Sequence, residues 1–131
     1  MSFFNKVFGD SDHKDTRQNA LAWNDLTSLK QLEDILEESE NIAVVIFKHS
    51  TRCGISKMSL KGFEKEYNIP ESDAKFYFLD LLNHRDISNA IAEKFNVYHE
   101  SPQLILIRNG KAVFHSSHGD ISAGDLVEKV K

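Results

Sequence analysis

The stretch Val44-Val45-Ile46-Phe47-Lys48-His49-Ser50-Thr51-Arg52-Cys53-Gly54-Ile55-Ser56 decides the fold. It starts as an apolar, β-branched run and continues as a short polar turn. The sole cysteine of the chain, Cys53, then stands where a helix is expected to begin. A thiol at a helix N-terminus lies near unbonded backbone N–H groups and the positive end of the helix dipole, which favour the nucleophilic thiolate. The stretch therefore predicts a reactive cysteine at a strand-to-helix junction.

The flanking sequence alternates between helical and extended patterns. Apolar residues recur at helical spacing in 27–38, where Thr27 or Ser28 can cap the start. Asn109-Gly110 between two extended runs favours a type I′ hairpin turn. Gly62 lies inside a predicted helix, at a cost of about 1 kcal/mol relative to alanine unless close packing requires it. The further predicted elements are strands 42–47, 75–82, 104–108 and 111–116, and helices 55–67, 86–95 and 122–130.

This order, α-β-α-β-α-β-β-α, predicts an α/β, thioredoxin-like fold. Its expected form is a central mixed four-stranded sheet flanked by helices, with an extra N-terminal helix. Residues 23–131 are expected to form this domain, and residues 1–22 a flexible N-terminal extension. Within the extension an aromatic cluster could line a short helix that contacts a membrane surface or a partner, but a frayed segment is the favoured interpretation.

Composition narrows the functional class. Of the 131 residues 40% are hydrophobic and 27% charged, which is typical of a globular domain. A net charge of −4 argues against a nucleic-acid partner. Neither a membrane span nor a secretory signal is expected, and one cysteine allows no intramolecular disulfide. These features favour a reducing, cytoplasmic compartment without membrane association.

Two further positions support thiol redox chemistry at Cys53. Ser56 stands where a dithiol enzyme carries its resolving cysteine, and its hydroxyl is expected to donate a hydrogen bond to the thiolate. Ser101-Pro102 precedes a strand, and X-Pro bonds are where cis peptides occur. We expect a cis bond beside the thiol, with the Ser101 backbone free to pair with an extended peptide. Without a second thiol, an outside thiol must resolve any mixed disulfide.

Other side chains near Cys53 are candidates for stabilising the thiolate or binding substrate. Arg52 and Lys57 supply positive charge, and Gly54 follows the cysteine directly. His49 could reach the thiol, and His118 follows the hairpin. A cysteine hydrolase with a histidine base is an alternative, although no oxyanion hole is evident. No metal site is predicted, since the usual cysteine and histidine ligand spacings are missing.

Four segments in this order resemble one family: 49–58, 85–92, 97–103 and 117–121. They resemble the YtxJ family of the bacillithiol redox system, the monothiol bacilliredoxins, from about Trp23 to the C-terminus. The resemblance implies a thioredoxin-like fold in the bacterial cytoplasm, with Cys53 as the redox cysteine. It also implies removal of bacillithiol from S-bacillithiolated proteins. Many relatives carry proline where this chain has Gly54.

Three functions follow as hypotheses. In the leading one, an oxidoreductase uses bacillithiol as co-substrate without a tightly bound cofactor, and a second bacillithiol or a partner reductase regenerates Cys53. In the second, the similarity of Cys-Gly-Ile-Ser at 53–56 to the Cys-Gly-Phe-Ser of monothiol glutaredoxins implies an iron–sulfur carrier. Against it, the expected Gly-Gly segment reads Ser116-Ser117-His118-Gly119. The third is a redox adaptor without turnover.

Overall fold

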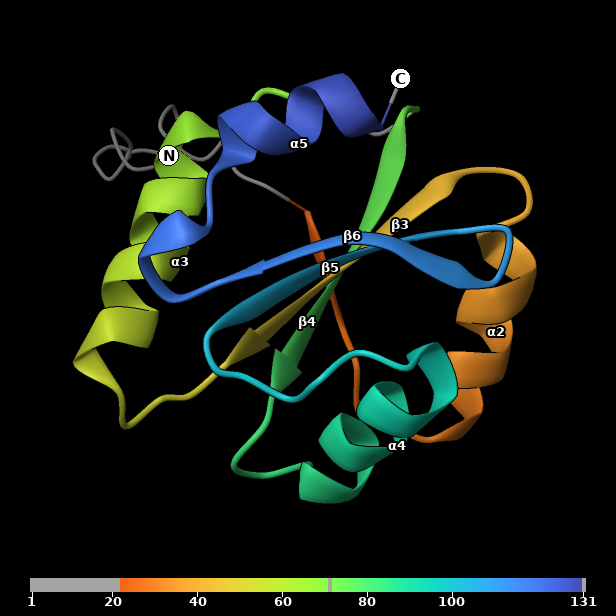
Figure 1. Cartoon of the computed structure of the whole chain (residues 1–131), viewed down its shortest axis with the longest axis horizontal. Helices are drawn as coiled ribbons and strands as arrows, with labels where there is room; N and C mark the ends of the chain where they lie inside the picture. Colours follow the sequence, from red (N-terminus) through yellow and green to blue (C-terminus); the bar gives the residue numbers. More distant parts are fainter. Residues whose placement is uncertain (1–21, 71, 131) are drawn as a thin grey trace, which may run out of the picture.

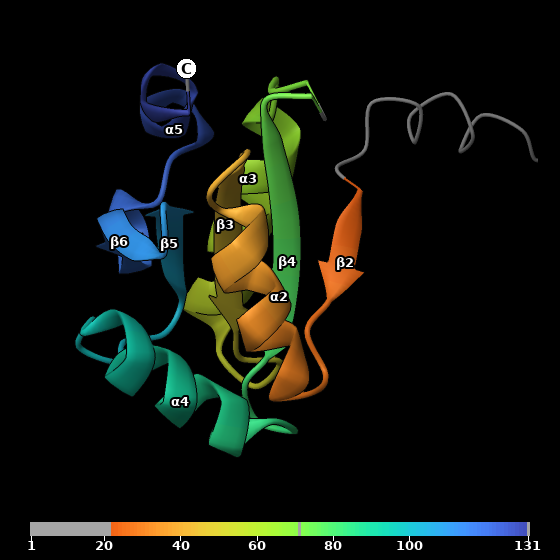
Figure 2. The same ribbon diagram turned by 90° about the vertical axis from the view of Figure 1, so that its right-hand side faces the viewer.

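A mixed five-stranded sheet with helices on both faces forms the domain (Figure 1). The computed structural model describes residues 22–70 and 72–130. Apart from residue 22, the predicted N-terminal extension lies outside the described residues. The strands lie in the order β2 (Trp23–Asp25), β4 (Ala74–Asp80), β3 (Ala43–His49), β5 (Gln103–Arg108) and β6 (Lys111–Ser117), which Figure 2 shows from one edge to the other.

Strand directions divide the sheet into two parts. The strands β2 and β3 both pair with β4 in parallel, so helices must carry the chain back between them. The strand β5 pairs antiparallel with β3 on one side and β6 on the other. The helix α3 (Gly54–Glu66) connects β3 to β4, and α4 (Arg85–Phe95) lies between β4 and β5.

The central strand β3 separates two hydrophobic cores, because alternate side chains of a strand point to opposite faces. Val44 and Ile46 belong to the core under α4 and α2 (Lys30–Glu38). Val45 and Phe47 belong to the core under α3 and α5 (Ala123–Lys129). All seven residues of β3 are buried. The same alternation carries on into the last two residues of the strand, which become important at the site.

The predicted order of elements is present, with one strand more than expected. The sheet has five strands and not four, because Trp23–Asp25 pairs with Phe76–Phe78 of β4. This short edge strand is held by its backbone and by the Asn24 amide, which donates to the Phe76 carbonyl over 3.0 Å. Two of its three residues are exposed, so it lacks the apolar alternation that reveals a strand in a sequence.

The first described helix begins later than predicted and has a different cap. It starts at Lys30, and neither Thr27 nor Ser28 caps it with its side chain. Instead the Gln31 side-chain carbonyl accepts hydrogen bonds from the backbone N–H groups of Thr27, over 2.7 Å, and Ser28, over 3.0 Å. The glutamine thus ties the segment before α2 to the first turn of the helix, and the hydroxyl cap that we expected at Thr27 or Ser28 is absent.

The hairpin between β5 and β6 agrees with its sequence pattern. Asn109 and Gly110 both have positive φ, 52° and 76°, as a type I′ turn requires. The Gly110 N–H donates to Ser39 Oγ over 2.8 Å, which ties the turn to the end of α2. Within the described part of the chain, every helix is too short or too polar to cross a bilayer.

Candidate functional site

Cys53 is the N-cap residue of α3, and its backbone is extended, with φ −105° and ψ 121°. Its N–H donates to the Ser50 carbonyl over 3.2 Å, and its carbonyl accepts from the Lys57 N–H over 3.1 Å. The first-turn N–H groups of a 13-residue helix have no intrahelical partner, so Cys53 stands beside donors and the positive end of the dipole. The residue is partly exposed. An incoming disulfide can therefore reach the thiol.

The Ser56 hydroxyl forms hydrogen bonds behind the active turn. Ser56 is fully buried, and its Oγ accepts from the Ser50 N–H over 3.0 Å. The same oxygen lies 2.8 Å from Nδ1 of His49. Burial is the main cause that lowers the pKa of His49, which favours the neutral ring and lets Nδ1 accept the Ser56 proton. The ring also packs against Phe78, with centroids 5.5 Å apart.

These bonds change the expected role of Ser56. A hydroxyl has one hydrogen, and when it points to His49 it is not available to the Cys53 thiolate. Among the described residues, the hydrogen bonds of Ser56 run to Ser50 and His49 and not to the thiol. We conclude that Ser56 and His49 together hold the turn that carries Cys53, and that neither bonds its sulfur.

The loop before β5 is linked to α3 by way of the backbone of His118. The Ser101–Pro102 peptide bond is cis. The Pro102 carbonyl accepts from the His118 N–H over 3.0 Å, and the His118 carbonyl accepts from Ser59 Oγ of α3 over 3.1 Å. His118 opens the short 3-10 helix η1 (His118–Asp120) with a positive φ of 54°. It therefore bridges the proline loop and α3 through its backbone, and not through the imidazole that the sequence analysis considered.

Buried polar atoms remain unpaired near the proline loop. The hydroxyl oxygen of Ser101 is buried without a hydrogen-bond partner among the described residues. Gln103 is fully buried, and its side-chain oxygen also has no hydrogen-bond partner among the described residues. The Gln103 amide nitrogen donates to the Tyr98 carbonyl over 2.9 Å, which holds the segment before the proline against β5.

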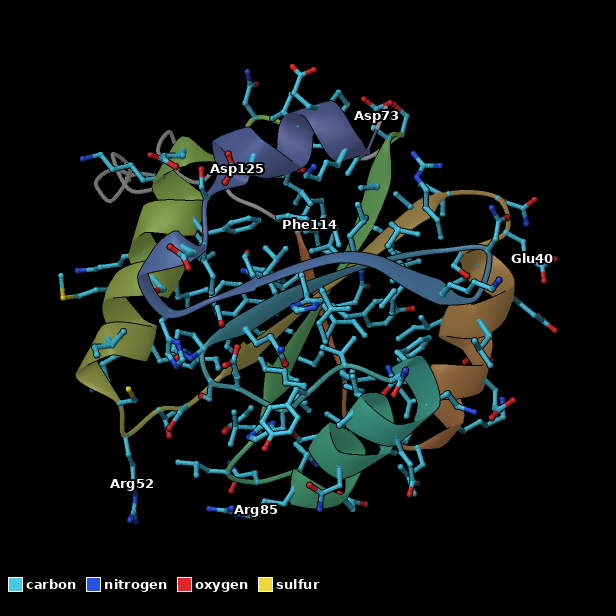
Figure 3. All side chains as sticks on the ribbon, in the orientation of Figure 1. Glu40, Arg52, Asp73, Arg85, Phe114 and Asp125 are labelled. Atoms are coloured by element: carbon cyan, nitrogen blue, oxygen red, sulfur yellow. The ribbon has the colours of Figure 1, made fainter. Side chains whose placement is uncertain are left out.

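The predicted basic residues lie around the start of α3. Arg52 is exposed and extends from the turn away from the body of the protein (Figure 3). Lys57 is exposed one turn into the helix. Gly54 has open space where a side chain would be, so no close packing requires glycine there. The site thus has a positive outer rim next to the thiol.

Sequence reasoning missed a second polar cluster, centred on Lys48. This residue is fully buried, and its Nζ lies 3.4 Å from the Ser88 carbonyl and 3.3 Å from His99 Nδ1. The Ser88 hydroxyl is 3.2 Å from the same imidazole nitrogen. Burial lowers the pKa of Lys48 to about 8. Burial also lowers the pKa of His99, and the positive charges of Lys48 and Arg85 lower it further. Lys48 follows the buried residues Val44 and Ile46 at the two-residue spacing of one strand face, which indicates a buried side chain. The predicted strand ended at Phe47, so this pattern was not extended to Lys48.

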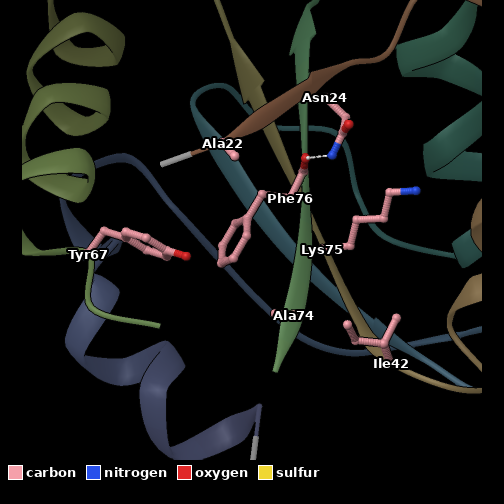
Figure 4. A pocket seen from close by; sticks show the side chains of 7 residues that line it. All are labelled: Ala22, Asn24, Ile42, Tyr67, Ala74, Lys75 and Phe76. Atoms are coloured by element: carbon pink, nitrogen blue, oxygen red, sulfur yellow. Dashed lines mark hydrogen bonds between the residues drawn. The ribbon is translucent and has the colours of Figure 1, made fainter. Parts of the chain in front are cut away.

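One hollow of the protein lies far from the thiol. Its volume is about 320 Å³, and it lies where β3 and β4 begin (Figure 4). Cys53 follows the opposite end of β3. The one charged lining residue of the hollow, Lys75, already pairs with Glu38 over 2.6 Å. In residues 22–70 and 72–130 there is no group of three or more histidine, cysteine, aspartate or glutamate side chains that could hold a metal ion.

Comparison with known proteins agrees with this geometry. The family model described as monothiol bacilliredoxin BrxC matches residues 24–126. A solved structure described as having a thioredoxin fold is 37% identical, with a TM-score of 0.69 over 82% of this chain and 92% of that chain. The thioredoxin of Schistosoma mansoni is 27% identical, with a TM-score of 0.60 over 82% and 96%. The thioredoxin of Trypanosoma brucei brucei is 26% identical, with a TM-score of 0.59 over 83% and 88%. The predicted thioredoxin-like fold is confirmed.

Proposed function

Because the chain belongs to the monothiol bacilliredoxin family, we propose that it removes bacillithiol from proteins that carry this thiol as a mixed disulfide. The observation that carries the proposal is the sole cysteine at the N-cap of α3, with a buried serine at the position of a resolving thiol. A single accessible thiol can accept a small thiol from a target. It cannot expel that small thiol with a second cysteine of the same chain.

The reaction has two thiol–disulfide exchanges. In the first, the Cys53 thiolate attacks the bacillithiol sulfur of the target's mixed disulfide. The old S–S bond breaks, the target leaves as a thiolate, and bacillithiol stays bonded to Cys53. In the second, another bacillithiol thiolate attacks the bacillithiol sulfur of this adduct. Bacillithiol disulfide then leaves and the Cys53 thiolate returns; a partner reductase that supplies the electrons is the alternative route.

The residues around Cys53 support these steps in different ways. The unbonded N–H groups of the first turn of α3 favour a negative sulfur. Arg52 and Lys57 attract an anionic small thiol, and the loop at Ser101 offers backbone to an extended target segment. Ser56 and His49 keep the turn in place through their hydrogen bond. A reducing cytoplasm is the compartment in which this chemistry has a supply of free thiols.

Intact-mass measurement tests the proposal. The reduced protein is mixed with a bacillithiolated model protein, and a Cys53→Ser variant serves as the control. We expect the wild type to gain the mass of one bacillithiol on Cys53 while the model protein recovers its free thiol. The control should gain nothing. Absence of transfer to wild-type protein whose Cys53 is shown to be free and reduced would refute the proposal.

A further inference from the structure

A second hollow starts one residue after Cys53 and runs along α3. Its volume is about 600 Å³. Four of its lining residues lie at positions 54, 57, 58 and 61, one stripe of the helix at the spacing i, i+3, i+4 and i+7. This places the hollow directly beside the reactive turn. The full lining is His49, Gly54, Lys57, Met58, Leu60 and Lys61.

The size and lining of this hollow are those of a small-molecule site. Such sites usually span roughly 300–1,000 Å³ and combine apolar walls with a few polar groups that orient the ligand. Met58 is 75% exposed at the rim, and Leu60 is partly buried at the wall. His49 adds a ring whose lowered pKa, chiefly from burial, favours the neutral form. The charged groups of the lining are therefore Lys57 and Lys61.

These two lysines carry unneutralised positive charge. They are one helical turn apart on the same stripe, and both are exposed. The ion pairs of the described residues involve Lys30, Lys75 and Lys94, so neither lysine of the hollow has an acidic partner within 4.0 Å there. The chain as a whole has a net charge of −4, so the two lysines form a local positive region on an acidic protein. This arrangement complements an anionic ligand.

We propose that the hollow is a subsite for the anionic part of the small thiol that Cys53 carries. The inference rests on the proposed function, and it adds Lys61 and the walls of the hollow. Lys57 and Lys61 lie four and eight residues after Cys53, about 6 Å and 12 Å along the helix axis. A thiol with its sulfur on Cys53 and its acidic groups at that separation spans the hollow. The same site would select anionic over neutral thiols.

Single-turnover transfer to Cys53 tests the subsite. One model protein is loaded either with bacillithiol or with 2-mercaptoethanol, which has no charge, so the target is the same in both arms. Wild type is compared with the variant Lys61→Gln. The control is Lys65→Gln, which removes a lysine of α3 that does not line the hollow. The Lys61→Gln variant should accept bacillithiol about two- to fivefold more slowly, as expected for losing one exposed charge pair.

The two arms separate the possible failures. We expect transfer of 2-mercaptoethanol to stay at the wild-type rate in Lys61→Gln, and Lys65→Gln to behave as wild type in both arms. Equal slowing of both substrates would show that Lys61 acts on the Cys53 thiolate and not on the ligand, which overturns the subsite. An unchanged rate with bacillithiol overturns the subsite and leaves the proposed function standing. Wild-type transfer of 2-mercaptoethanol but not of bacillithiol would overturn both.

Discussion

Lys48 and His49 are neighbours on β3, yet they enter opposite faces of the sheet and very different polar surroundings. His49 shares a hydrogen bond with the Ser56 hydroxyl, and both groups can be neutral. Lys48 is buried against a carbonyl and an imidazole, with no acidic group within 4.0 Å among the described residues. A buried pair of neutral groups costs little, whereas a buried ammonium without a carboxylate is expensive.

This contrast gives the two faces different tasks. The face under α3 uses neutral hydrogen bonds to hold the turn of Cys53. The face under α4 holds the unfavourable charge of Lys48, whose imidazole partner is His99. His99 lies in the segment that leads to Ser101. Removing the buried charge of Lys48 should therefore raise the stability of the fold, whereas removing the Ser56 hydroxyl should lower it.

The largest shift is expected from Lys48→Met. Lowering the pKa of Lys48 from its usual 10.5 to about 8 corresponds to roughly 3 kcal/mol at pH 7. Loss of the contacts to Ser88 and His99 offsets part of this gain. We therefore expect the variant to raise the free energy of unfolding by roughly 2 kcal/mol in urea titrations at pH 7. A loss of stability would show that Lys48 is favourable where it lies.

The same variant has a defined pH signature. Unfolded chains keep Lys48 protonated up to about pH 10.5, whereas the folded protein releases the proton near pH 8. Between these values the unfolded state binds more protons, so wild-type stability gains from rising pH. The advantage of Lys48→Met should be complete below pH 8 and shrink as the pH approaches 10.5. An advantage that stays constant from pH 7 to 10 would contradict the burial of a charged lysine.

Ser56→Ala should shift stability in the opposite direction. It leaves the Ser50 N–H and His49 Nδ1 without their shared partner inside the protein, at a cost of about 1–2 kcal/mol. The matched control is Ser88→Ala on the other face, which removes one hydroxyl contact to His99 and should cost less than 1 kcal/mol. Chemical unfolding of both variants measures the difference. Equal costs would remove the special role assigned to Ser56.

A smaller gain is expected from Gly62→Ala, inside α3. Nothing lies within 4 Å of the position that an alanine Cβ would take, so the glycine serves no close packing. Alanine should add about 1 kcal/mol of stability through helix propensity alone. Thermal unfolding checks this, and the rate of transfer to Cys53 should stay unchanged. A slower rate would extend the functional surface along the helix to this position.

The smallest effect is expected from Gly54→Pro. Residue 54 is the first of α3, where proline is favoured, and the extended backbone of Cys53 suits a residue before proline. Open space surrounds the position. The variant should gain roughly 0.4–1 kcal/mol, mainly by restricting the unfolded chain. A destabilised variant, measured by thermal unfolding, would mean that the Gly54 N–H bonds within the turn.

Much of the fold could be predicted because its signals are local. The order of helices and strands after β2, the Asn109-Gly110 turn and the start of a helix next to Cys53 all follow from short sequence patterns. The strand β2 could not be found in this way. Its pairing comes from backbone groups that meet β4 only after the chain has folded.

The site was harder to predict because its hydrogen bonds join residues from different elements. Cys53, Ser56 and the proline loop were identified from their spacing alone. The choice of the Ser56 hydroxyl between Cys53 and His49 depends on which side of the turn His49 occupies, and the sequence carries no local signal for that. The burial of Lys48 likewise depends on α4 packing over the end of β3.

The most direct test of the account is a full cycle followed by intact mass. Reduced protein is first mixed with an excess of bacillithiolated model protein in the absence of free bacillithiol. Free bacillithiol is added in a second step. We expect one bacillithiol per chain on Cys53, formed at the same rate as the model protein's free thiol appears. After free bacillithiol is added, this group should leave as bacillithiol disulfide. Release of the model protein's thiol by the Cys53→Ser variant, or by wild type without an adduct on Cys53, would contradict it.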